Sequence, residues 1–190
     1  TKKNERQIQG LIEGFFLEKG ARGPAYNSIV ASGDNACILH YTLNNSELNQ
    51  GDLLLVDAGC SLIDYYNGDI TRTIPIGGKF SKEQKLIYEI VLEAQKTAIK
   101  NSVKGSNSTN VHYVALRILV EGLKEIGLLR GDTDGIIENG SYKHLYMHRT
   151  GHWLGLDVHD VGAYRMGEYD VPLQNGMILT VEPGIYISDR

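Results

Sequence analysis

Two apolar runs in this sequence each lead directly into a carboxylate. Residues 53–56 (Leu-Leu-Leu-Val) precede Asp57, and residues 177–181 (Met-Ile-Leu-Thr-Val) precede Glu182. Runs of this length and composition are typical of buried strands. A carboxylate is costly to bury unless something positive pairs with it. Two strand ends of this kind in one chain therefore indicate a bound cation.

A further carboxylate, Asp69, follows Asp57 in a segment that favours a β-hairpin. Residues 53–60 and about 65–75 are the expected strands, and each carries one Asp. Two facing carboxylates repel, so the pKa of one rises unless a cation lies nearby; a divalent metal removes the conflict. The alternative is that both are turn or N-cap residues on a solvated edge. The pattern of strand, carboxylate, small residue and Gly recurs at Glu182, which weighs against that alternative.

Histidines cluster in the second half of the chain. The spacing of His148, His152 and His159 would align them on one helix face, although Gly residues between them weaken a helix there. The zinc-protease helix signature does not apply, because Arg149 stands where that motif has Glu. A lone His is more often a satisfied surface or core residue. Three histidines flanked by Gly and Trp within a short segment instead favour a site.

Three other histidines lack that context or show it only in part. His40 ends an apolar run, and it is either a site residue or the end of an ordinary strand. His112 and His144 lie in segments with no such frame, so we interpret them as structural.

The candidate ligand set is rich in carboxylates and poor in histidine. Such a set favours a hard or borderline dication, Mn²⁺ first, with Co²⁺ or Zn²⁺ compatible. More carboxylates than one ion needs indicate two ions, about 3.5–4 Å apart, that share a bridging water or hydroxide. That arrangement is suited to hydrolysis.

Composition excludes several classes of protein. The 190 residues are 42% hydrophobic and 22% charged, an ordinary balance for one globular domain. A net charge of −4 leaves no basic surplus for nucleic acid. No apolar stretch approaches the roughly 18 residues of a membrane span. The two cysteines, Cys37 and Cys60, form no paired motif, which favours small buried hydrophobes in a reducing, cytoplasmic setting.

The apolar periodicity predicts an α+β protein. We expect helices over residues 4–19, from Ser81 to about Lys100, and from Ser108 or Thr109 to Gly127. We expect short strands at 26–31, 37–41, 53–60, 65–75, 177–181 and 184–188, and loops at 130–142 and 162–175. Strands and helices do not alternate regularly, so the sheet should be curved, largely antiparallel and backed by helices.

Several short segments occur in a characteristic order along nearly the whole chain: Ile38-Leu-His-Tyr-Thr, Asp57-Ala-Gly-Cys, Gly68-Asp-Ile-Thr-Arg-Thr, Gly151-His-Trp-Leu-Gly-Leu-Asp-Val-His-Asp-Val-Gly and Leu179-Thr-Val-Glu-Pro-Gly-Ile-Tyr. Together they resemble the Xaa-Pro aminopeptidase (aminopeptidase P) and prolidase family. The resemblance implies the pita-bread metallopeptidase fold. Residues 1–190 would then be a partial catalytic domain, truncated at both ends.

The resemblance also implies a set of metal ligands. Asp57, Asp69, His152 and Glu182 match the family's ligand positions. Asp69 would bridge two divalent ions, and Glu182 would also take the proton from the attacking water. A second bridging carboxylate is expected on a strand beyond Arg190, so the isolated 190 residues should be inactive.

Three histidines match the family's substrate site. His40, His148 and His159 would orient the scissile carbonyl and stabilise the developing oxyanion. Arg149 departs from the family pattern, which more often has Gly there.

The implied activity is removal of an N-terminal residue that precedes proline. The substrates would be peptides with proline at the second position. Neither nucleic acid nor a membrane is expected as a partner. An Xaa-Pro dipeptidase (prolidase) is the alternative within the enzyme class, and a catalytically inactive pita-bread binding module is the alternative outside it. The resemblance further implies a homo-oligomeric parent protein with an additional N-terminal domain.

Overall fold

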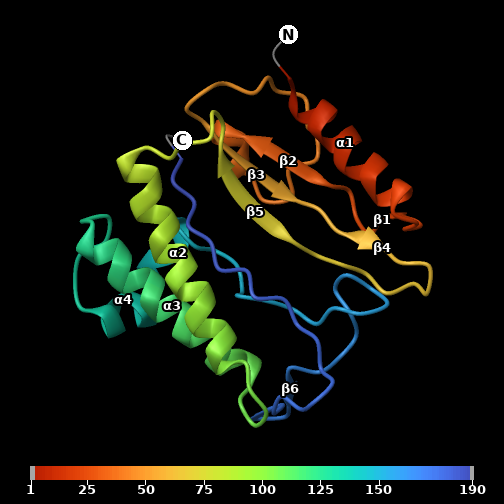
Figure 1. The fold of residues 1–190 in the computed structure, drawn as a ribbon. Coiled ribbons are helices and arrows are strands. Elements are labelled where there is room, and N and C mark those ends of the chain that lie inside the picture. The colour runs from red at the N-terminus through yellow and green to blue at the C-terminus, as the bar shows by residue number, and fades with distance from the viewer. Residues whose placement is uncertain (1–2, 189–190) are drawn as a thin grey trace. The chain divides into compact units, whose positions relative to one another are not determined.

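The computed structural model describes residues 3–188 and divides the chain into two compact units (Figure 1). Unit 1 comprises residues 1–82, 154–160 and 187–190, and unit 2 comprises residues 83–153 and 161–186. Each unit has its own cluster of buried apolar residues. The two units therefore each position their own share of the residues that the sequence singles out.

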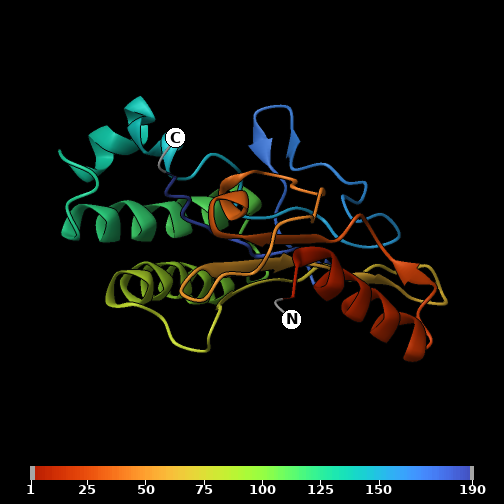
Figure 2. The ribbon, with the colours of Figure 1, turned by 90° about the horizontal axis from the view of Figure 1, so that it is seen from above.

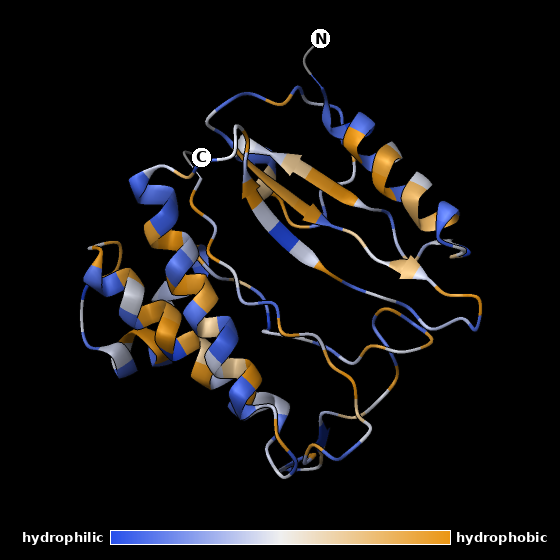
Figure 3. Cartoon of the chain, viewed as in Figure 1, coloured by the Kyte–Doolittle hydropathy of each residue, from blue (hydrophilic) through white to orange (hydrophobic). Residues whose placement is uncertain are grey.

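Unit 1 contains an antiparallel sheet in the order β2–β3–β5. Its strands are β2 (Ile29–Ser32), β3 (Leu53–Asp57) and β5 (Thr71–Pro75). Apolar residues run along β2 and β3, as Figure 3 shows. The register pairs Asp57 with Ile29 on one side and with Thr71 on the other. The predicted hairpin is confirmed, and it places Asp57 at the end of the central strand.

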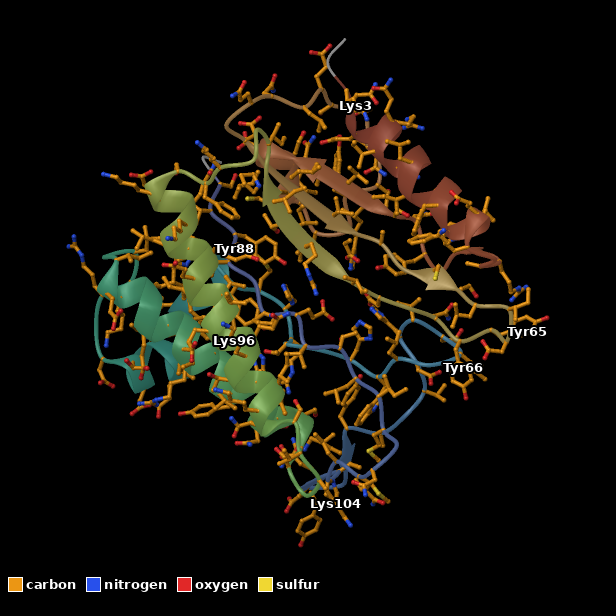
Figure 4. All side chains as sticks on the ribbon, in the orientation of Figure 1. Lys3, Tyr65, Tyr66, Tyr88, Lys96 and Lys104 are labelled. Atoms are coloured by element: carbon orange, nitrogen blue, oxygen red, sulfur yellow. The ribbon has the colours of Figure 1, made fainter. Side chains whose placement is uncertain are left out.

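The connection between β3 and β5 is more elaborate than a simple hairpin turn. Its short strand β4 (Cys60–Ser61) pairs with β1 (Gly23–Pro24) instead of with β5. Tyr65 and Tyr66 lie on the exposed loop that follows β4 (Figure 4). This extra pairing fixes the chain between the two predicted aspartates.

Helix α1 (Glu5–Glu18) packs beside this sheet and confirms the helix expected at residues 4–19. Asn4 caps it in a capping box: its side chain accepts from the Gln7 backbone N–H, and the Gln7 side chain accepts from the Asn4 backbone N–H. Residues 3–5 also bond to residues 46–48 through backbone groups. The first turn of α1 is thereby tied to a loop that ends near Glu47.

The strand predicted at residues 37–41 is wrong. The chain forms a 3₁₀ helix, η1 (Gly33–Cys37), and continues irregularly, with His40 in the left-handed region at φ 55°. The apolar residues of this run suggest a strand. Asn35 and Tyr41 instead donate hydrogen bonds to the buried carboxylate of Glu5, and these bonds fix the path of the segment. A tertiary contact has overridden the local pattern.

Unit 2 is built on three helices: α2 (Lys82–Asn101), α3 (Ser108–Glu125) and α4 (Thr133–Asn139). The first two match the predicted helices. They lie side by side in Figures 1 and 2, and a Cβ at Gly122 of α3 would come within 2.6 Å of the Ile90 side chain of α2. Gly122 therefore permits the close contact between the two helices. No described helix is long and apolar enough to cross a membrane.

Helix α4 corrects the loop predicted at residues 130–142. Its Gly, Asp and Asn residues act as helix ends: Asp132 accepts from two backbone N–H groups at the start, and Gly140 adopts φ 72° at the end. Ile136 is buried in the helical core. A short 3₁₀ helix, η2 (Ser141–His144), follows.

The expected strands at 177–181 and 184–188 are not regular strands. The first is an extended run with one bridge, Leu179 to Trp153, and Met177 and Ile178 are 40% and 57% exposed rather than buried. The predicted loop at 162–175 contains a small hairpin of β6 (Arg165–Met166) and β7 (Tyr169–Asp170). The backbone of the extended run and of Glu182 hydrogen-bonds to residues 150–152, and these bonds hold Glu182 in place.

Candidate metal centre

In unit 1 a single phenol joins the two predicted aspartates. The Tyr26 hydroxyl lies 2.5 Å from Asp57 Oδ1 and 3.0 Å from Asp69 Oδ1, and both carboxylates are half-buried. Burial, followed by the hydrogen bond and charge of Asp57 and the charge of Asp69, raises the pKa of Tyr26 far above its usual value. The phenol therefore stays protonated and donates to the carboxylates.

This arrangement fits a divalent cation. A phenol has one proton, so it cannot donate fully to two carboxylates at once. Two half-buried carboxylates close to one hydroxyl repel each other, and a divalent cation would offset that repulsion. Carboxylate oxygens are the donors that hard dications prefer. Asp57 and Asp69 therefore stay predicted metal ligands.

In unit 2 the predicted ligands His152 and Glu182 face each other. His152 Nδ1 lies 2.8 Å from the Trp153 carbonyl oxygen, which only accepts, so Nδ1 carries a proton. Nε2 lies 3.2 Å from Glu182 Oε1. The Thr180 hydroxyl donates to the same oxygen at 2.8 Å and accepts from the His152 backbone N–H at 2.9 Å. The imidazole and the carboxylate are thus both oriented.

A cation suits this pair as well. With the proton on Nδ1, a neutral His152 turns the lone pair of Nε2 toward a carboxylate oxygen. Either a second ring proton or a metal ion between them would give both His152 Nε2 and the Glu182 oxygen a favourable partner. Metal-binding histidines usually donate their other N–H to a carbonyl or carboxylate, as His152 does to Trp153.

His148 lies on the same segment but has different partners. Its Nδ1 lies 2.8 Å from the Arg149 carbonyl oxygen, and its Nε2 lies 2.7 Å from the Tyr186 hydroxyl. The ring packs edge-on against Tyr146 with 4.9 Å between centroids. These contacts fit a residue that acts on substrate rather than a metal ligand.

The helix suggested for the histidine segment does not form. Residues 147–152 contain no regular helix, and the backbone there bonds to residues 180–182. A Cβ at Gly151 would lie 1.9 Å from the Thr180 carbonyl oxygen, so only Gly allows the two segments to approach this closely. This proximity holds His152 against Glu182.

His40 and His159 both lie in unit 1 and both are exposed. Residues 154–160, which carry His159, are held by Asn67, whose backbone N–H donates to Gly155 O at 2.9 Å and whose side chain donates to Leu156 O at 2.7 Å. Asn67 stands two residues before Asp69. His159 is thereby tied to the segment that bears a predicted ligand.

Among the described residues, no three or more His, Cys, Asp or Glu groups lie together in a way that could hold one ion. Unit 1 brings Asp57 together with Asp69, and unit 2 brings His152 together with Glu182. Sequence reasoning missed the partners that orient these pairs, Tyr26 and Thr180. Tyr26 stands in none of the quoted motifs, and Thr180 stands in one of them without any feature that assigns it a role.

The whole chain, residues 1–190, matches the sequence family described as metallopeptidase family M24. The chain belongs to this family. Xaa-Pro aminopeptidases of Haemophilus influenzae and Escherichia coli are 53% and 48% identical to it over 97% of its length. The solved aminopeptidase PepP of Pseudomonas aeruginosa superimposes with a TM-score of 0.96 and 51% identity over 98% of this chain.

The matches also show how much of each relative the chain represents. It spans 43% and 41% of the two curated relatives and 42% of the solved aminopeptidase. The similarity confirms the α+β pita-bread fold and the metallopeptidase class that the resemblance implied for this M24 chain.

Tyr26 allows a direct test of the predicted carboxylate ligands Asp57 and Asp69. Tyr26→Phe removes the hydroxyl shared by Asp57 and Asp69 and keeps the ring. We expect the affinity of the full-length protein for divalent metal to fall about 10- to 100-fold, because residues that orient ligands have effects of this size. Metal titration measures the change. Tyr65→Phe on the exposed loop is the matched control; equal affinities for the two variants would contradict a role for the shared phenol.

His112, interpreted from sequence as structural, belongs to a buried network in unit 2. Its Nδ1 accepts from the Thr150 backbone N–H at 3.2 Å and lies 2.9 Å from the Thr150 hydroxyl. Thr150 is 1% exposed and also contacts the Tyr146 hydroxyl. Burial, then the charges of Arg149 and His148, lowers the pKa of His112 to about 4.

This network predicts loss of stability in acid. Unfolded His112 has its ordinary pKa of 6.5, so between pH 6.5 and about 4 the unfolded chain binds a proton that the folded chain excludes. Its contribution is complete above pH 6.5 and falls with pH, by up to about 3 kcal/mol. Urea denaturation of the full-length protein from pH 4 to 7.5 measures this. His112→Gln keeps an acceptor and should flatten the profile; an unchanged slope would refute the assignment.

Proposed function

We propose that this chain is part of the catalytic domain of an Xaa-Pro aminopeptidase, which hydrolyses the bond between an N-terminal residue and a following proline. The observation that carries the proposal is the pairing of predicted ligands inside each unit, Asp57 with Asp69 and His152 with Glu182. Membership of family M24 and relatives of that name at 53% and 48% identity support it.

The four paired residues are the proposed ligands of two divalent ions. Three carboxylates and one imidazole favour Mn²⁺, although the Escherichia coli aminopeptidase P has also been solved with zinc substituted. When bound, such ions polarise the scissile carbonyl and lower the pKa of water. Asp69, which shares the Tyr26 hydroxyl with Asp57, is the proposed bridging ligand.

Glu182 is the proposed acceptor of the proton from the attacking water. Its Oε1 accepts a hydrogen bond from Thr180 at 2.8 Å and faces His152, so the carboxylate is held in one orientation. A fixed carboxylate at the reacting atoms is what general base catalysis requires.

His40, His148 and His159 are the proposed contacts to the substrate. His148 Nδ1 carries a proton and donates it in a hydrogen bond to the Arg149 carbonyl oxygen. Nε2 can therefore donate to a substrate oxygen only when the ring is doubly protonated. In the neutral ring Nε2 accepts from the Tyr186 hydroxyl, which is 2.7 Å away. His148 and Tyr186 thus form a coupled donor and acceptor, which is the proposed contact to a substrate oxygen.

The decisive experiment measures metal content and hydrolysis together, on the 190-residue chain and on the full-length protein. We expect about two ions and cleavage of Xaa-Pro-Xaa tripeptides only in the full-length protein. Activity on Xaa-Pro dipeptides alone would indicate a prolidase. A full-length protein that neither holds metal nor cleaves would favour a binding module. The solved Escherichia coli enzyme bound the inhibitor Pro-Leu, which has the chemistry of the product that a tripeptide would release.

The setting of the enzyme is also part of the proposal. Cys37 and Cys60 are free thiols, which fits a reducing cytoplasm. The resemblance implies a homo-oligomer, and sedimentation of the full-length protein tests that state.

A further inference from the structure

Unit 1 contains a buried carboxylate that the proposed mechanism does not use. Glu5, in the first turn of α1, is 0% exposed and is the only buried residue of that helix. An ionised carboxylate in this environment is strongly unfavourable unless hydrogen bonds replace the lost water. Its position therefore demands a set of dedicated donors.

The Glu5 carboxylate accepts five hydrogen bonds. Oε1 accepts from the Ser32 backbone N–H, the Ser32 hydroxyl and the Asn35 side chain at 2.7, 2.8 and 3.1 Å. Oε2 accepts from the Tyr41 hydroxyl at 2.8 Å and from the Ser46 backbone N–H at 2.9 Å. Burial acts to raise the pKa of Glu5, but the hydrogen bonds from Ser46, Asn35 and Ser32 outweigh it and hold the pKa below its ordinary value. Glu5 is therefore ionised.

The donors come from the start, the middle and the end of one loop. We call residues 32–46 the His40 loop. Glu5 holds it at Ser32, where β2 ends, at Tyr41, and at Ser46. Beyond Ser32 the loop runs through η1 and contains no strand. One side chain thus replaces the hydrogen bonding that a regular element would provide.

His40 sits immediately before one of these anchors. Its φ of 55° is in the left-handed region, which is unfavourable for a residue other than Gly. Ile38 and Leu39 are 42% and 44% exposed, so apolar burial of the preceding residues contributes little. Tyr41 is 6% exposed and bonded to Glu5. The anchor at Tyr41 is what sustains the unusual backbone at His40.

We propose that Glu5 is a positioning residue for His40: its buried carboxylate fixes the His40 loop so that His40 keeps the backbone conformation in which its imidazole meets the substrate. This inference rests on the proposed function, because contact between His40 and substrate belongs to that proposal. Glu5 itself touches neither substrate nor metal ligand in this assignment.

The test is a double-mutant cycle in the full-length, metal-loaded protein. We expect Glu5→Gln to lower kcat/KM for an Xaa-Pro-Xaa tripeptide about 10- to 100-fold, because small displacements of a catalytic group have effects of that size. Metal content should stay at two ions. Combined with His40→Ala, Glu5→Gln should add almost nothing, since both changes remove one interaction. Losses that multiply independently would overturn the proposal.

Two further variants separate positioning from general destabilisation. Leu123→Ala truncates a fully buried residue of unit 2 and should lower Tm without the loss in kcat/KM. Tyr41→Phe removes one hydroxyl from the network and should lower kcat/KM in the same direction, by a smaller factor. It also decides the question if Glu5→Gln does not fold: wild-type kinetics for Tyr41→Phe would then count against the proposal.

Hydrogen exchange provides a readout that does not depend on catalysis. Glu5→Gln or Tyr41→Phe should accelerate amide exchange at residues 38–41 selectively, while β3 and α3 keep wild-type protection. If the wild-type protein fails to cleave any Xaa-Pro peptide, the proposed function fails, and exchange still tests whether Glu5 orders the His40 loop. Unchanged exchange at residues 38–41 would overturn the inference even in an active enzyme.

Discussion

Asp69→Asn in the full-length protein is expected to remove metal and activity together. Asp69 is the proposed bridging ligand, and it shares the Tyr26 hydroxyl with Asp57. A neutral amide offers one carbonyl oxygen and no charge, so it cannot hold two dications in place of a carboxylate. We expect kcat/KM for a tripeptide to fall about a thousandfold or more. Elemental analysis of the purified variant should show fewer than two ions.

The matched comparison is His159→Ala, which lies in the same unit. His159 is a proposed substrate contact, so this variant should keep both ions while kcat falls about a hundredfold. If His159→Ala instead empties the site, the division between ligands and substrate histidines is wrong. If Asp69→Asn retains two ions and near wild-type turnover, the assignment of the carboxylate pair fails.

Gly59→Ala is expected to destabilise the protein severely without replacing any proposed ligand. A Cβ at Gly59 would lie 1.7 Å from the carbonyl oxygen of Gly68 and 2.4 Å from its carbonyl carbon. These are backbone atoms that cannot rotate away, and Gly68 directly precedes Asp69. The chain around β4 must shift, at a cost of about 3 kcal/mol or more. That is a large part of a typical stability of about 5–15 kcal/mol.

Urea denaturation of the full-length protein measures this effect. Gly14→Ala in α1 is the control, because a Cβ there meets nothing within 4 Å. An added methyl in the middle of a helix should raise stability by up to about 1 kcal/mol. The two substitutions are chemically identical and should have opposite signs. A Gly59→Ala variant as stable as Gly14→Ala would show that the approach at Gly68 is not tight.

Local signals predicted much of the fold. Apolar periodicity located α1, α2 and α3. An apolar run leading into Asp57 and a following segment that carries Asp69 located the pairing of β3 with β5. These elements are specified by residues close in sequence, so a single chain reveals them.

Elements that depend on distant contacts were not predicted. Asp132 and Gly140 resemble loop residues until α4 is seen between them as a capped helix. The His40 loop resembles a strand until Glu5 is seen to hold it. Tyr26 and Thr180 escaped notice because tyrosine and threonine are ordinary residues, and only the fold brings them to the carboxylates.

The capping box at Asn4 has a consequence for where the catalytic domain can be cut. Helix ends fray first, and the first turn of α1 contains Glu5. Trimming the chain at Glu5 would remove the cap, with a loss of about 1 kcal/mol, and would also remove the backbone bond from Leu48 to Lys3. Fraying there would release Ser32 and Ser46 at the same time. A functional domain boundary must therefore lie before Lys3, even though no proposed ligand or substrate contact occurs in the first 25 residues of the chain.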